Sequence, residues 1–372
     1  MFICGLKQRD QTPIMDVAIL GASGDCGREI AAQLVAERLL APTERLQLVG
    51  RGEGRSARVL HGLVSDLTDA YAEHVPDIDV VLSPDDIVAD VWVVAAGQTL
   101  PADGAALGAA VGGARGNLAQ SNAEVFRLYA DALAKHGQGT EIVIVVSNPV
   151  ELGVAIFAEK IDRRRVIGIG AYSDTLRFRR ELATDLGIRR QRVAGFMIGE
   201  HGDAQVPVWS SVQIHGMQSE ELAATVSKLR RGVSLSTFAE ICAREREALS
   251  GLLKSGQVAE AFGRVDTLPP DVRVVIKPYV THLSGAKTVK ATANVTIDLV
   301  RTLLDGREVL VAGQVQLEGD FYGLDGPLGV PVIVGPSGIT RIVEIPLNAE
   351  ERRQIQTISH SVQQKVEKWM GK

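Results

Sequence analysis

The sequence has few cysteines and no long apolar segment. Its three cysteines, Cys4, Cys26 and Cys242, lie far apart without a CxxC pair, so the sequence predicts neither a disulfide framework nor a thiolate zinc site. The apolar start of the chain is soon interrupted by Lys7 and Arg9, and no later run is long enough to span a membrane. We therefore expect a cytoplasmic protein without a signal peptide and without membrane contact.

The sequence also lacks an excess of positive charge. It has 40 lysines and arginines against 45 aspartates and glutamates, a net charge of −5, and its arginine clusters, such as 163–165, are short. A nucleic-acid partner is therefore not expected. With 372 residues, 45% of them hydrophobic, the chain is long enough for two globular domains with a shared interface.

From residue 16 on, short apolar runs alternate with segments of helical period. The runs read DVAIL, RLQLVG, VWVVAAG, EIVIVVSNP and RVIGIG, and helical segments such as 28–40 and 121–135 lie between them. Short continuous apolar runs are typical of buried parallel strands, and the periodic segments are typical of crossover helices. The pattern predicts a doubly wound, Rossmann-type parallel sheet of the α/β class.

After about residue 170 the pattern changes. Longer helical segments cover 173–186, 219–231, 236–254 and 291–304, and the runs VLVAGQVQLEG, VPVIVG and ITRIVEIPL predict strands, with GPSG as a turn between the last two. A final amphipathic helix is expected from 349 to about 370. We therefore predict a dinucleotide-binding domain at 1–170, whose residues 1–15 form a loose extension, and an α+β substrate domain at 171–372.

The turn between the first strand and the first helix reads GASGDCG, residues 21–27. Gly21 allows a tight turn, Gly24 lets the backbone approach a pyrophosphate, and Gly27 lets helix and strand pack closely. A turn that merely needs small residues would show the same glycines, but the flanking strand and helix supply the context that a phosphate-binding turn requires. The turn therefore predicts a dinucleotide cofactor bound by Gly21, Ala22, Ser23, Gly24, Asp25, Cys26 and Gly27.

The second strand ends without the acidic residue that would bind the ribose hydroxyls of NAD. It ends instead in Gly50 and Arg51, with Arg55 and Ser56 near. The absence of that carboxylate removes its repulsion of a 2′-phosphate, and Arg51, with Arg55 and Ser56 near, can form charge-assisted bonds to one. This favours NADP, or loose discrimination between NADP and NAD. The alternative is that Arg51 stacks on adenine or faces solvent.

A histidine lies between two glycines and two carboxylates in MIGEHGDAQVP, residues 197–207. A lone histidine, here His201, is more often a surface or packing residue than a catalytic one. Three segments precede it in the chain: ARGNLAQSN (114–122), SNPVE (147–151) and SDTLRFRREL (173–182). Together with GASGDCG and the C-terminal GVPVIVGPSGITRIVEIPLN, these segments resemble the lactate/malate dehydrogenase family from about residue 16 to the end. The nearest resemblance is to malate dehydrogenases with a GASG turn and a GR after the second strand.

The resemblance implies a role in the reaction for three residues. His201 is the expected acid/base that exchanges a proton with the substrate hydroxyl, which needs a group titrating near neutrality. Asp174 is expected to bond the other ring nitrogen, and Arg177 to clamp the substrate carboxylate with a bidentate fork. Taken alone, Asp174 could instead cap a helix and Arg177 could form a surface ion pair.

The resemblance implies further site residues in loops and at strand ends. Arg115 is expected to polarise the reacting carbonyl from a closing loop, although a lone arginine there would otherwise be solvated. Asn148 and Asn122 are expected to orient substrate and nicotinamide, although either could be an ordinary turn or cap residue. Gly97 and Val146 complete the expected cofactor site. No residue is expected to bind a metal.

Two segments depart from the family pattern. The loop of residues 98–114 is about twice the usual length and holds no basic residue, and Leu100 falls near the position where malate enzymes carry an arginine for the second carboxylate. An apolar residue there favours an apolar or bulkier 2-keto acid, because an unpaired buried carboxylate is costly. The second segment, 275–294, is also longer than usual. In it Thr288 falls on a pocket position, and the neighbouring Lys287 or Lys290 either replaces the missing arginine or is simply solvated.

The resemblance thus implies an NAD(P)-dependent 2-hydroxyacid dehydrogenase that forms a homodimer or homotetramer. It favours malate and oxaloacetate, whereas the long loop favours a lactate-like or bulkier apolar substrate. Two other classes remain as alternatives. One is a metal-dependent glycosidase that requires NAD, for which the Cys/His metal pair expected after the Asn-Pro turn is absent. The other is a nucleotide-binding relative without catalysis, against which the retention of His201, Asp174, Arg177 and Arg115 speaks.

Overall fold

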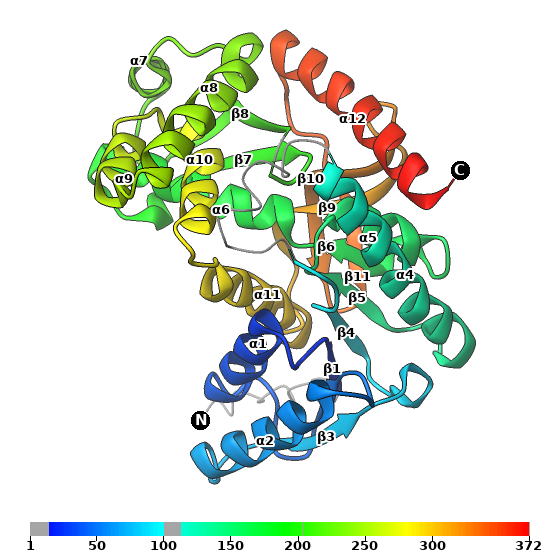
Figure 1. Cartoon of the computed structure of the whole chain (residues 1–372). Helices are drawn as coiled ribbons and strands as arrows, with labels where there is room; N and C mark the ends of the chain where they lie inside the picture. Colours follow the sequence, from blue (N-terminus) through cyan, green and yellow to red (C-terminus); the bar gives the residue numbers. More distant parts are fainter. Residues whose placement is uncertain (1–14, 100–112, 203, 372) are drawn as a thin grey trace, which may run out of the picture.

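In the computed structural model of the chain, the described residues are 15–99, 113–202 and 204–371 (Figure 1). These residues form one eleven-stranded sheet with helices packed against it. The predicted extension at 1–15 lies outside the described residues, except for Met15.

The first part of the sheet is parallel. Its strands are β1 (Val17–Leu20), β2 (Arg45–Val49), β3 (Asp77–Val81), β4 (Val91–Val94), β5 (Ile142–Val145) and β6 (Val166–Gly168). They pair in the order β3-β2-β1-β4-β5-β6 with parallel registers throughout. This is the order of a doubly wound dinucleotide-binding sheet, and it confirms the predicted Rossmann-type architecture.

The burial of each strand explains whether its sequence shows a continuous apolar run. Every residue of β1, β4 and β5 is buried, as expected for strands covered on both faces. The edge strand β3 buries only Val81, and its sequence DIDVV alternates acidic with apolar residues, so it does not read as a continuous apolar run. The helices of this part are α1 (Asp25–Ala36), α2 (Arg55–Ala70), α4 (Gly113–His136) and α5 (Val150–Ala158).

The second part of the sheet is antiparallel. Its strands are β7 (Val193–Gly199), β8 (Gln205–Ile214), β9 (Val309–Phe321), β10 (Leu324–Gly335) and β11 (Gly338–Ile342). They continue the sheet in the order β6-β9-β10-β7-β8, with β11 paired to β10 across the predicted GPSG turn. The two parts join where Gly168 of β6 pairs with Gln314 of β9. One sheet therefore runs from the nucleotide-binding part into the second part without a break.

The helices of the second part cover this antiparallel segment. They are α6 (Gly170–Leu186), α7 (Ser219–Arg230), α8 (Leu235–Lys254), α9 (Val258–Asp266), α10 (Pro270–Leu283), α11 (Val289–Leu304) and α12 (Ala349–Met370). The expected helices near 173–186, 219–231, 236–254, 291–304 and 349–370 are all present, whereas α9 and α10 were not expected. In Figure 1, α12 (red) lies beside α5 and α4, and α11 lies alongside α1.

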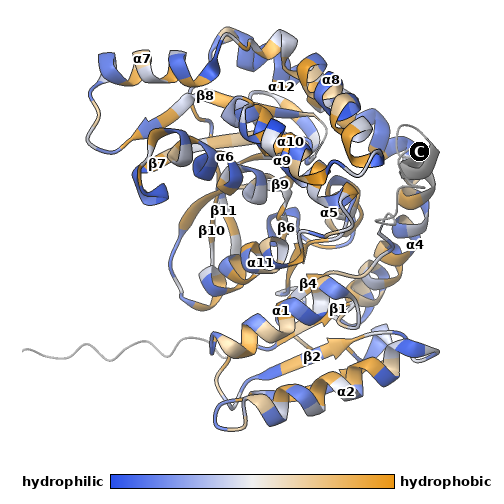
Figure 2. Ribbon diagram, turned by 60° about the vertical axis from the view of Figure 1, so that its left-hand side comes forward, coloured by the Kyte–Doolittle hydropathy of each residue, from blue (hydrophilic) through white to orange (hydrophobic). Residues whose placement is uncertain are grey.

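The colouring of Figure 2 shows how apolar residues are distributed over these elements. Strand β2 is mostly hydrophobic, while α7 and α2 alternate hydrophilic and hydrophobic residues along their length. This is the pattern of helices that bury one face and expose the other. In the part of the chain that the structure describes, every helix is too short or too polar to cross a membrane.

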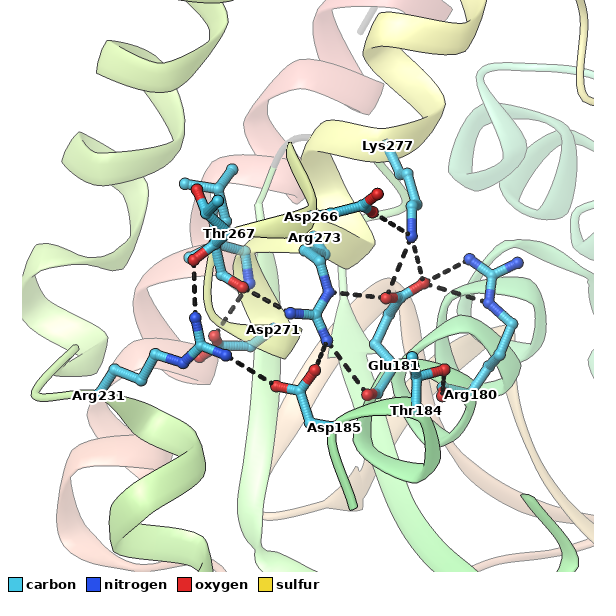
Figure 3. Close-up of polar contacts among 12 residues, drawn as sticks. Arg180, Glu181, Thr184, Asp185, Arg231, Asp266, Thr267, Asp271, Arg273 and Lys277 are labelled. Carbon is cyan, nitrogen blue, oxygen red and sulfur yellow. Dashed lines mark hydrogen bonds and ion pairs between the residues drawn. The ribbon is translucent and has the colours of Figure 1, made fainter. Parts of the chain in front are cut away.

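A buried ion network fastens α10 to α6, the helix that carries Asp174 and Arg177. Figure 3 shows the guanidinium of Arg273, which is 2% exposed, between the carboxylates of Glu181 and Asp185. Nε of Arg273 lies 2.7 Å from Oε2 of Glu181, and one Nη lies 2.5 Å from Oδ1 of Asp185. Buried charges are tolerated when they are paired in this way. The network therefore ties α10 to α6 near the C-terminal end of α6.

Candidate active site

His201 lies in the short turn between β7 and β8. Gly199 and Gly202, on either side of it, have φ of 99° and 91°, a left-handed conformation that glycine adopts without strain. A Cβ on Gly199 would lie 2.8 Å from the carbonyl oxygen of Ala204. The glycines of the GEHG segment are therefore required by the turn that presents the imidazole.

The imidazole of His201 is held by a buried carboxylate. Its Nδ1 lies 2.7 Å from Oδ2 of Asp174, whose side chain is 2% exposed. This contact commits Nδ1 to the carboxylate and leaves Nε2 for proton exchange with a substrate. Burial disfavours the imidazolium, yet the charge of Asp174 and its hydrogen bond raise the pKa of His201 above its ordinary value. The pair is arranged for proton transfer, and Asp174 favours the protonated imidazole.

The second oxygen of Asp174 holds the guanidinium of Arg177. Nη1 of Arg177 lies 2.7 Å from Oδ1 of Asp174. Burial opposes ionisation of Asp174, but the charges and hydrogen bonds of His201 and Arg177 lower its pKa. Because α6 starts at Gly170 after the cap residue Ile169, Asp174 is not a helix cap. Because the Arg177 side chain is only 15% exposed, its ion pair is not a surface pair either.

Two buried side chains to which the sequence analysis gave no role support the His201 turn. Oε1 of Glu151, on α5, accepts a hydrogen bond from the backbone N–H of His201 at 2.7 Å and another from Nε2 of Gln314, on β9, at 3.2 Å. Oε1 of Gln314 accepts from the backbone N–H of Ala171, in the first turn of α6, at 2.9 Å. Burial raises the pKa of Glu151 to about 7. A chain of hydrogen bonds thus links the His201 turn to the helix that carries Asp174.

The sequence contains one feature that could have singled out each of these two residues, Gln314 and Glu151. Gln314 is a polar residue inside the apolar run VLVAGQVQLEG, and a glutamine at a fully buried position needs hydrogen-bonding partners. Glu151 is an acid at the start of the apolar helix α5, at the end of the SNPVE segment. Neither signal indicates which partner the side chain has.

The ring of His201 packs against the start of α6. A Cβ on Gly170 would come within 2.6 Å of Cβ and Cγ of His201 and within 2.9 Å of Nε2 of Gln314. Only glycine leaves room for the imidazole at this point. The position of the ring is therefore set by backbone contact as well as by Asp174.

Charged side chains from two helices hold the residues on either side of His201. Nζ of Lys365, on α12, lies 2.7 Å from Oε2 of Glu200. Nη2 of Arg246, on α8, donates to the carbonyl oxygen of Gly202 at 3.2 Å. Elements far apart in the sequence therefore meet at this turn.

The turn after β1 leaves no room for side chains at two of its glycines. A Cβ on Gly21 would lie 2.6 Å from Cα of Ala96, and a Cβ on Gly27 would lie 2.4 Å from the carbonyl oxygen of Gly21. The cap residue of α1, Gly24, has no side chain to bond the first N–H groups of the helix. Such N–H groups bind phosphate, so the turn fits the pyrophosphate of a dinucleotide. The remaining residues of the predicted turn, Ala22, Ser23, Asp25 and Cys26, lie between β1 and the first turn of α1.

Packing at the end of β2 explains why the expected acid is missing. A Cβ on Gly50 would lie 2.5 Å from Oγ of Ser56 and 2.6 Å from a methyl carbon of Leu60, both on α2. The Ser56 hydroxyl accepts from the backbone N–H of Arg51 at 3.2 Å and contacts Oγ of Ser23 at 2.9 Å. A carboxylate-bearing side chain at position 50 would displace this contact between α2 and the turn after β1. The Arg51 side chain is exposed beside it.

Asn122 is engaged with backbone on two sides. Its Oδ1 accepts from the N–H of Gln98 at 2.7 Å, and its Nδ2 donates to the carbonyl oxygens of Gln98 at 3.0 Å and of Asn148 at 2.6 Å. A Cβ on Gly97 would lie 3.0 Å from that Oδ1. Asn122 therefore positions the ends of β4 and β5, where Asn148 is exposed and Val146 is buried.

The two lysines beside the predicted pocket form ion pairs with α1. Nζ of Lys287 lies 2.6 Å from Oδ2 of Asp25, and Nζ of Lys290 lies 3.1 Å from Oε1 of Glu29. Both partners are on α1, and Lys290, whose side chain is 85% exposed, remains largely solvated. Counting positions from the motif could not show toward which helix these side chains point.

The structure gives less detail for three other predicted site residues. Leu100 lies outside the described residues, and Arg115 belongs to the first turn of α4, where the structure describes only the backbone. Thr288 is the cap residue of α11 and is half-buried. Within 15–99, 113–202 and 204–371, no group of three or more histidine, cysteine, aspartate or glutamate side chains is placed to hold a metal ion.

Comparison with known families identifies two matching regions. The sequence model of the lactate/malate dehydrogenase NAD-binding domain matches residues 15–168, and that of the lactate/malate dehydrogenase α/β C-terminal domain matches 173–241 and 277–371. The unmatched residues 242–276 form most of α8, all of α9 and the start of α10. The gap between the two matched segments overlaps the segment 275–294, which the sequence analysis singled out as longer than usual, only at residues 275 and 276.

Curated relatives match over most of the chain at low identity. An L-2-hydroxycarboxylate dehydrogenase (NAD(P)(+)) of Methanocaldococcus jannaschii is 27% identical over 345 residues, which cover 91% of this chain and 93% of the relative. A malate dehydrogenase of Methanosphaera stadtmanae is 26% identical over 366 residues, covering 96% and 100%. An L-lactate dehydrogenase 2 of Enterococcus faecalis is 30% identical over 247 residues, covering 66% and 67%.

Solved structures of similar fold cover nearly the whole chain. A malate dehydrogenase of Cryptosporidium parvum superposes with a TM-score of 0.73 at 22% identity, covering 96% of this chain and 99% of its own. A lactate dehydrogenase of the same organism, in complex with lactic acid and nicotinamide adenine dinucleotide, gives 0.71 at 21% identity, covering 95% and 97%. At this identity the likeness concerns the fold.

Proposed function

The chain belongs to the lactate/malate dehydrogenase family, and we propose that it interconverts a 2-hydroxy acid and the corresponding 2-keto acid with NAD or NADP. The observation that carries this proposal is the arrangement of His201, Asp174 and Arg177, in which one buried carboxylate holds both an imidazole and a guanidinium. When bound at the turn after β1, the nicotinamide cofactor accepts or supplies the hydride.

The side chains of the site carry out proton transfer, substrate binding and polarisation of the keto oxygen. In the oxidation direction Nε2 of His201 takes the proton of the substrate hydroxyl, and in the reduction direction the imidazolium returns a proton to the keto oxygen. Asp174 stabilises the imidazolium and keeps Nδ1 directed at itself. Arg177 binds the substrate carboxylate with the N–H groups that it does not donate to Asp174, which orients the substrate toward His201. We assign to Arg115 the polarisation of the keto oxygen.

We further propose that NADPH is used at least as well as NADH. The support is the close packing of Gly50 against Ser56, which leaves no room for an acidic side chain, together with exposed Arg51 and Arg55 beside it. A 2′-phosphate near Arg51 and Arg55 would therefore meet cations and would not be repelled by a carboxylate at position 50.

The cofactor proposal is tested by kcat/KM for both nucleotides in wild type and in Arg51→Ala. We expect the variant to lose about tenfold with NADPH, on the order of 1.4 kcal/mol, and to be unchanged with NADH. Arg58→Ala, at an exposed position further along α2, is the matched control and should change neither value. A hundredfold preference of the wild type for NADH, about 2.7 kcal/mol, would contradict the proposal.

For the substrate we propose malate and oxaloacetate first. The support is that two relatives matching more than nine tenths of the chain are a 2-hydroxycarboxylate dehydrogenase and a malate dehydrogenase. A second candidate is a lactate-like or bulkier apolar 2-hydroxy acid. It is favoured by the absence of a basic residue from 98–114 and by the commitment of Lys287 and Lys290 to α1.

A panel of 2-keto acids assayed with NADH and NADPH separates these possibilities. Oxaloacetate turned over faster than pyruvate and longer alkyl 2-keto acids supports malate, and the reverse order supports the second candidate. Catalytic failure on every acid, with nucleotide still bound, would contradict the dehydrogenase and leave a nucleotide-binding relative without catalysis.

We also propose that the chain acts in the cytoplasm as a homodimer or homotetramer. The low cysteine content supports a reducing compartment. Sedimentation at micromolar concentration tests the assembly, and a monomer under these conditions would contradict it.

A further inference from the structure

A lysine of the second part of the chain reaches the first residue of the nucleotide helix. Lys287 lies between α10 and α11, and its Nζ is 2.6 Å from Oδ2 of Asp25, where α1 begins. Arg28, one turn along α1, binds the other carboxylate oxygen with Nη2 at 2.8 Å. Figure 1 shows α11 alongside α1, the packing that brings Lys287 to this place.

An acidic residue at this position affects the turn in two ways. A carboxylate in the first turn of a helix favours the helix, because the N-terminal end carries positive potential. The same carboxylate repels a pyrophosphate bound to the free N–H groups of that turn. Asp25 therefore stabilises α1 and opposes the ligand that the turn fits.

The cations around Asp25 outweigh the repulsion between its carboxylate and a bound pyrophosphate. The hydrogen bond to Lys287, and then that to Arg28, lower the pKa of Asp25, so its carboxylate stays ionised and paired. The positive charge of Lys287 also acts on the neighbouring Cys26, whose thiol pKa is raised mainly by burial. Two cations and one anion thus meet at the first turn of α1. Their summed charge is positive, as a phosphate ligand requires.

We propose that Lys287 binds the pyrophosphate of the dinucleotide directly, so that the substrate-binding part of the chain supplies a cation to the cofactor. An ammonium group has three N–H donors, so Lys287 keeps Asp25 and donates to a phosphate oxygen at the same time. Its side chain is 42% exposed, which leaves it accessible to a ligand. The proposal rests on the dinucleotide site at the turn after β1.

Lys290 provides the contrast that makes the proposal specific. It forms the corresponding ion pair with Glu29, which lies four residues further along α1 and therefore about 6 Å away from the phosphate end. A third pair, between Arg301 and Glu37, lies near the other end of the helix. All three pairs connect α1 with α11 or the loop before it, but only Lys287 lies at the end that binds phosphate.

The first experiment measures the Kd of NADH and NADPH by nucleotide fluorescence, without a keto acid, in wild type, Lys287→Met and Lys290→Met. We expect Lys287→Met to weaken both nucleotides about five- to twentyfold and to reduce the dependence of Kd on salt, because a charged contact is lost. Lys290→Met should stay within twofold of wild type. Equal Kd values in the two variants would overturn the proposal. Absence of binding in wild type would instead overturn the dinucleotide site of the proposed function.

The second experiment separates contact from charge neutralisation. If Lys287 only neutralised Asp25, then removing the carboxylate would make the lysine dispensable, and Asp25→Asn would bind nucleotide as tightly as the Asp25→Asn, Lys287→Met double variant. We expect the double variant to bind several-fold more weakly than Asp25→Asn alone. Equal affinity of the two would overturn the proposal.

Discussion

The protonation of His201 is decided by opposing effects at a single residue. Burial disfavours the imidazolium, while the carboxylate of Asp174, at 2.7 Å, and the charge of Glu151 favour it, and the net effect raises its pKa above 6.5. Since reduction of a keto acid needs the imidazolium, kcat/KM for reduction should be constant at low pH and fall as pH rises through this raised pKa. Oxidation should show the opposite profile.

Replacing Asp174 by Asn tests the origin of the raised pKa. The amide keeps the shape of the side chain and removes its charge, so the fall in the reduction profile should move to lower pH. The rate should also drop by about a hundredfold or more. The measurement is kcat/KM against pH for a keto acid in both proteins. A profile that keeps its midpoint in the variant would show that Asp174 does not set the pKa of His201.

Glu151 makes stability depend on pH in an unusual direction. Burial raises its pKa from 4.5 to about 7, so between these values the folded state keeps a proton that the unfolded state has lost. Unfolded chains then bind fewer protons than folded ones, and the free energy of unfolding falls as pH rises from about 4.5 to 7. Glu151→Gln removes this dependence, so its stability relative to wild type should increase over the same range.

Denaturant unfolding at pH 5 and pH 7 measures this difference. Glu318→Gln, an exposed carboxylate, is the control and should show no comparable change between the two pH values. The prediction is contradicted if wild type and Glu151→Gln keep the same difference in free energy of unfolding at both.

At the residue scale the motifs indicate the side chains to which we assign the chemistry, and the structure adds the residues that hold them. His201, Asp174 and Arg177 come from local patterns with recognisable chemistry. Glu151 and Gln314 could not be assigned, because their contacts join positions 50 and 163 residues apart, and only the fold brings such positions together.

Among the elements, α6 depends on a buried anchor. Arg273 pairs with Glu181 and Asp185, and all three side chains are at most 15% exposed. Arg273→Met should therefore lower the free energy of unfolding by about 3 kcal/mol, because it leaves buried carboxylates without their main partner. Chemical denaturation gives this value. Lys160→Met, which breaks an exposed pair with Asp131, should lower the free energy of unfolding far less, because solvent screens exposed ion pairs. Similar losses in the two variants would contradict the anchoring role.

The elements that escaped sequence-based prediction share a physical reason. The strand β3 is an edge strand with only one buried residue, so it lacks the continuous apolar run that marks β1, β4 and β5. The helix α9 spans nine residues, too few for its period to stand out. The helix α10 is longer, with fourteen residues, but Pro278 lies inside it and interrupts its helical pattern. The buried strands β1, β4 and β5 were recognisable, because burial imposes a clear pattern on them.

For the whole molecule, the unbroken sheet is the dominant feature. The predicted boundary near residue 170 falls between β6 and α6, yet β6 pairs with β9, and α5 and α12 pack across the same region. We therefore expect one cooperative thermal transition in calorimetry, with calorimetric and van't Hoff enthalpies in agreement. Two resolved transitions in the protein without ligand would contradict this expectation.

The contacts of α12 also determine when the active site is completed during synthesis on the ribosome. Translation delivers His201, Asp174 and Arg177 well before residues 349–370, yet Lys365 on α12 holds Glu200 beside the histidine, and α12 packs on β7 and β10. A nascent chain that stalls before this helix thus carries the reactive side chains without the support of the His201 turn. Dehydrogenase activity should accordingly arise late in translation, after the nucleotide-binding strands have already left the ribosome.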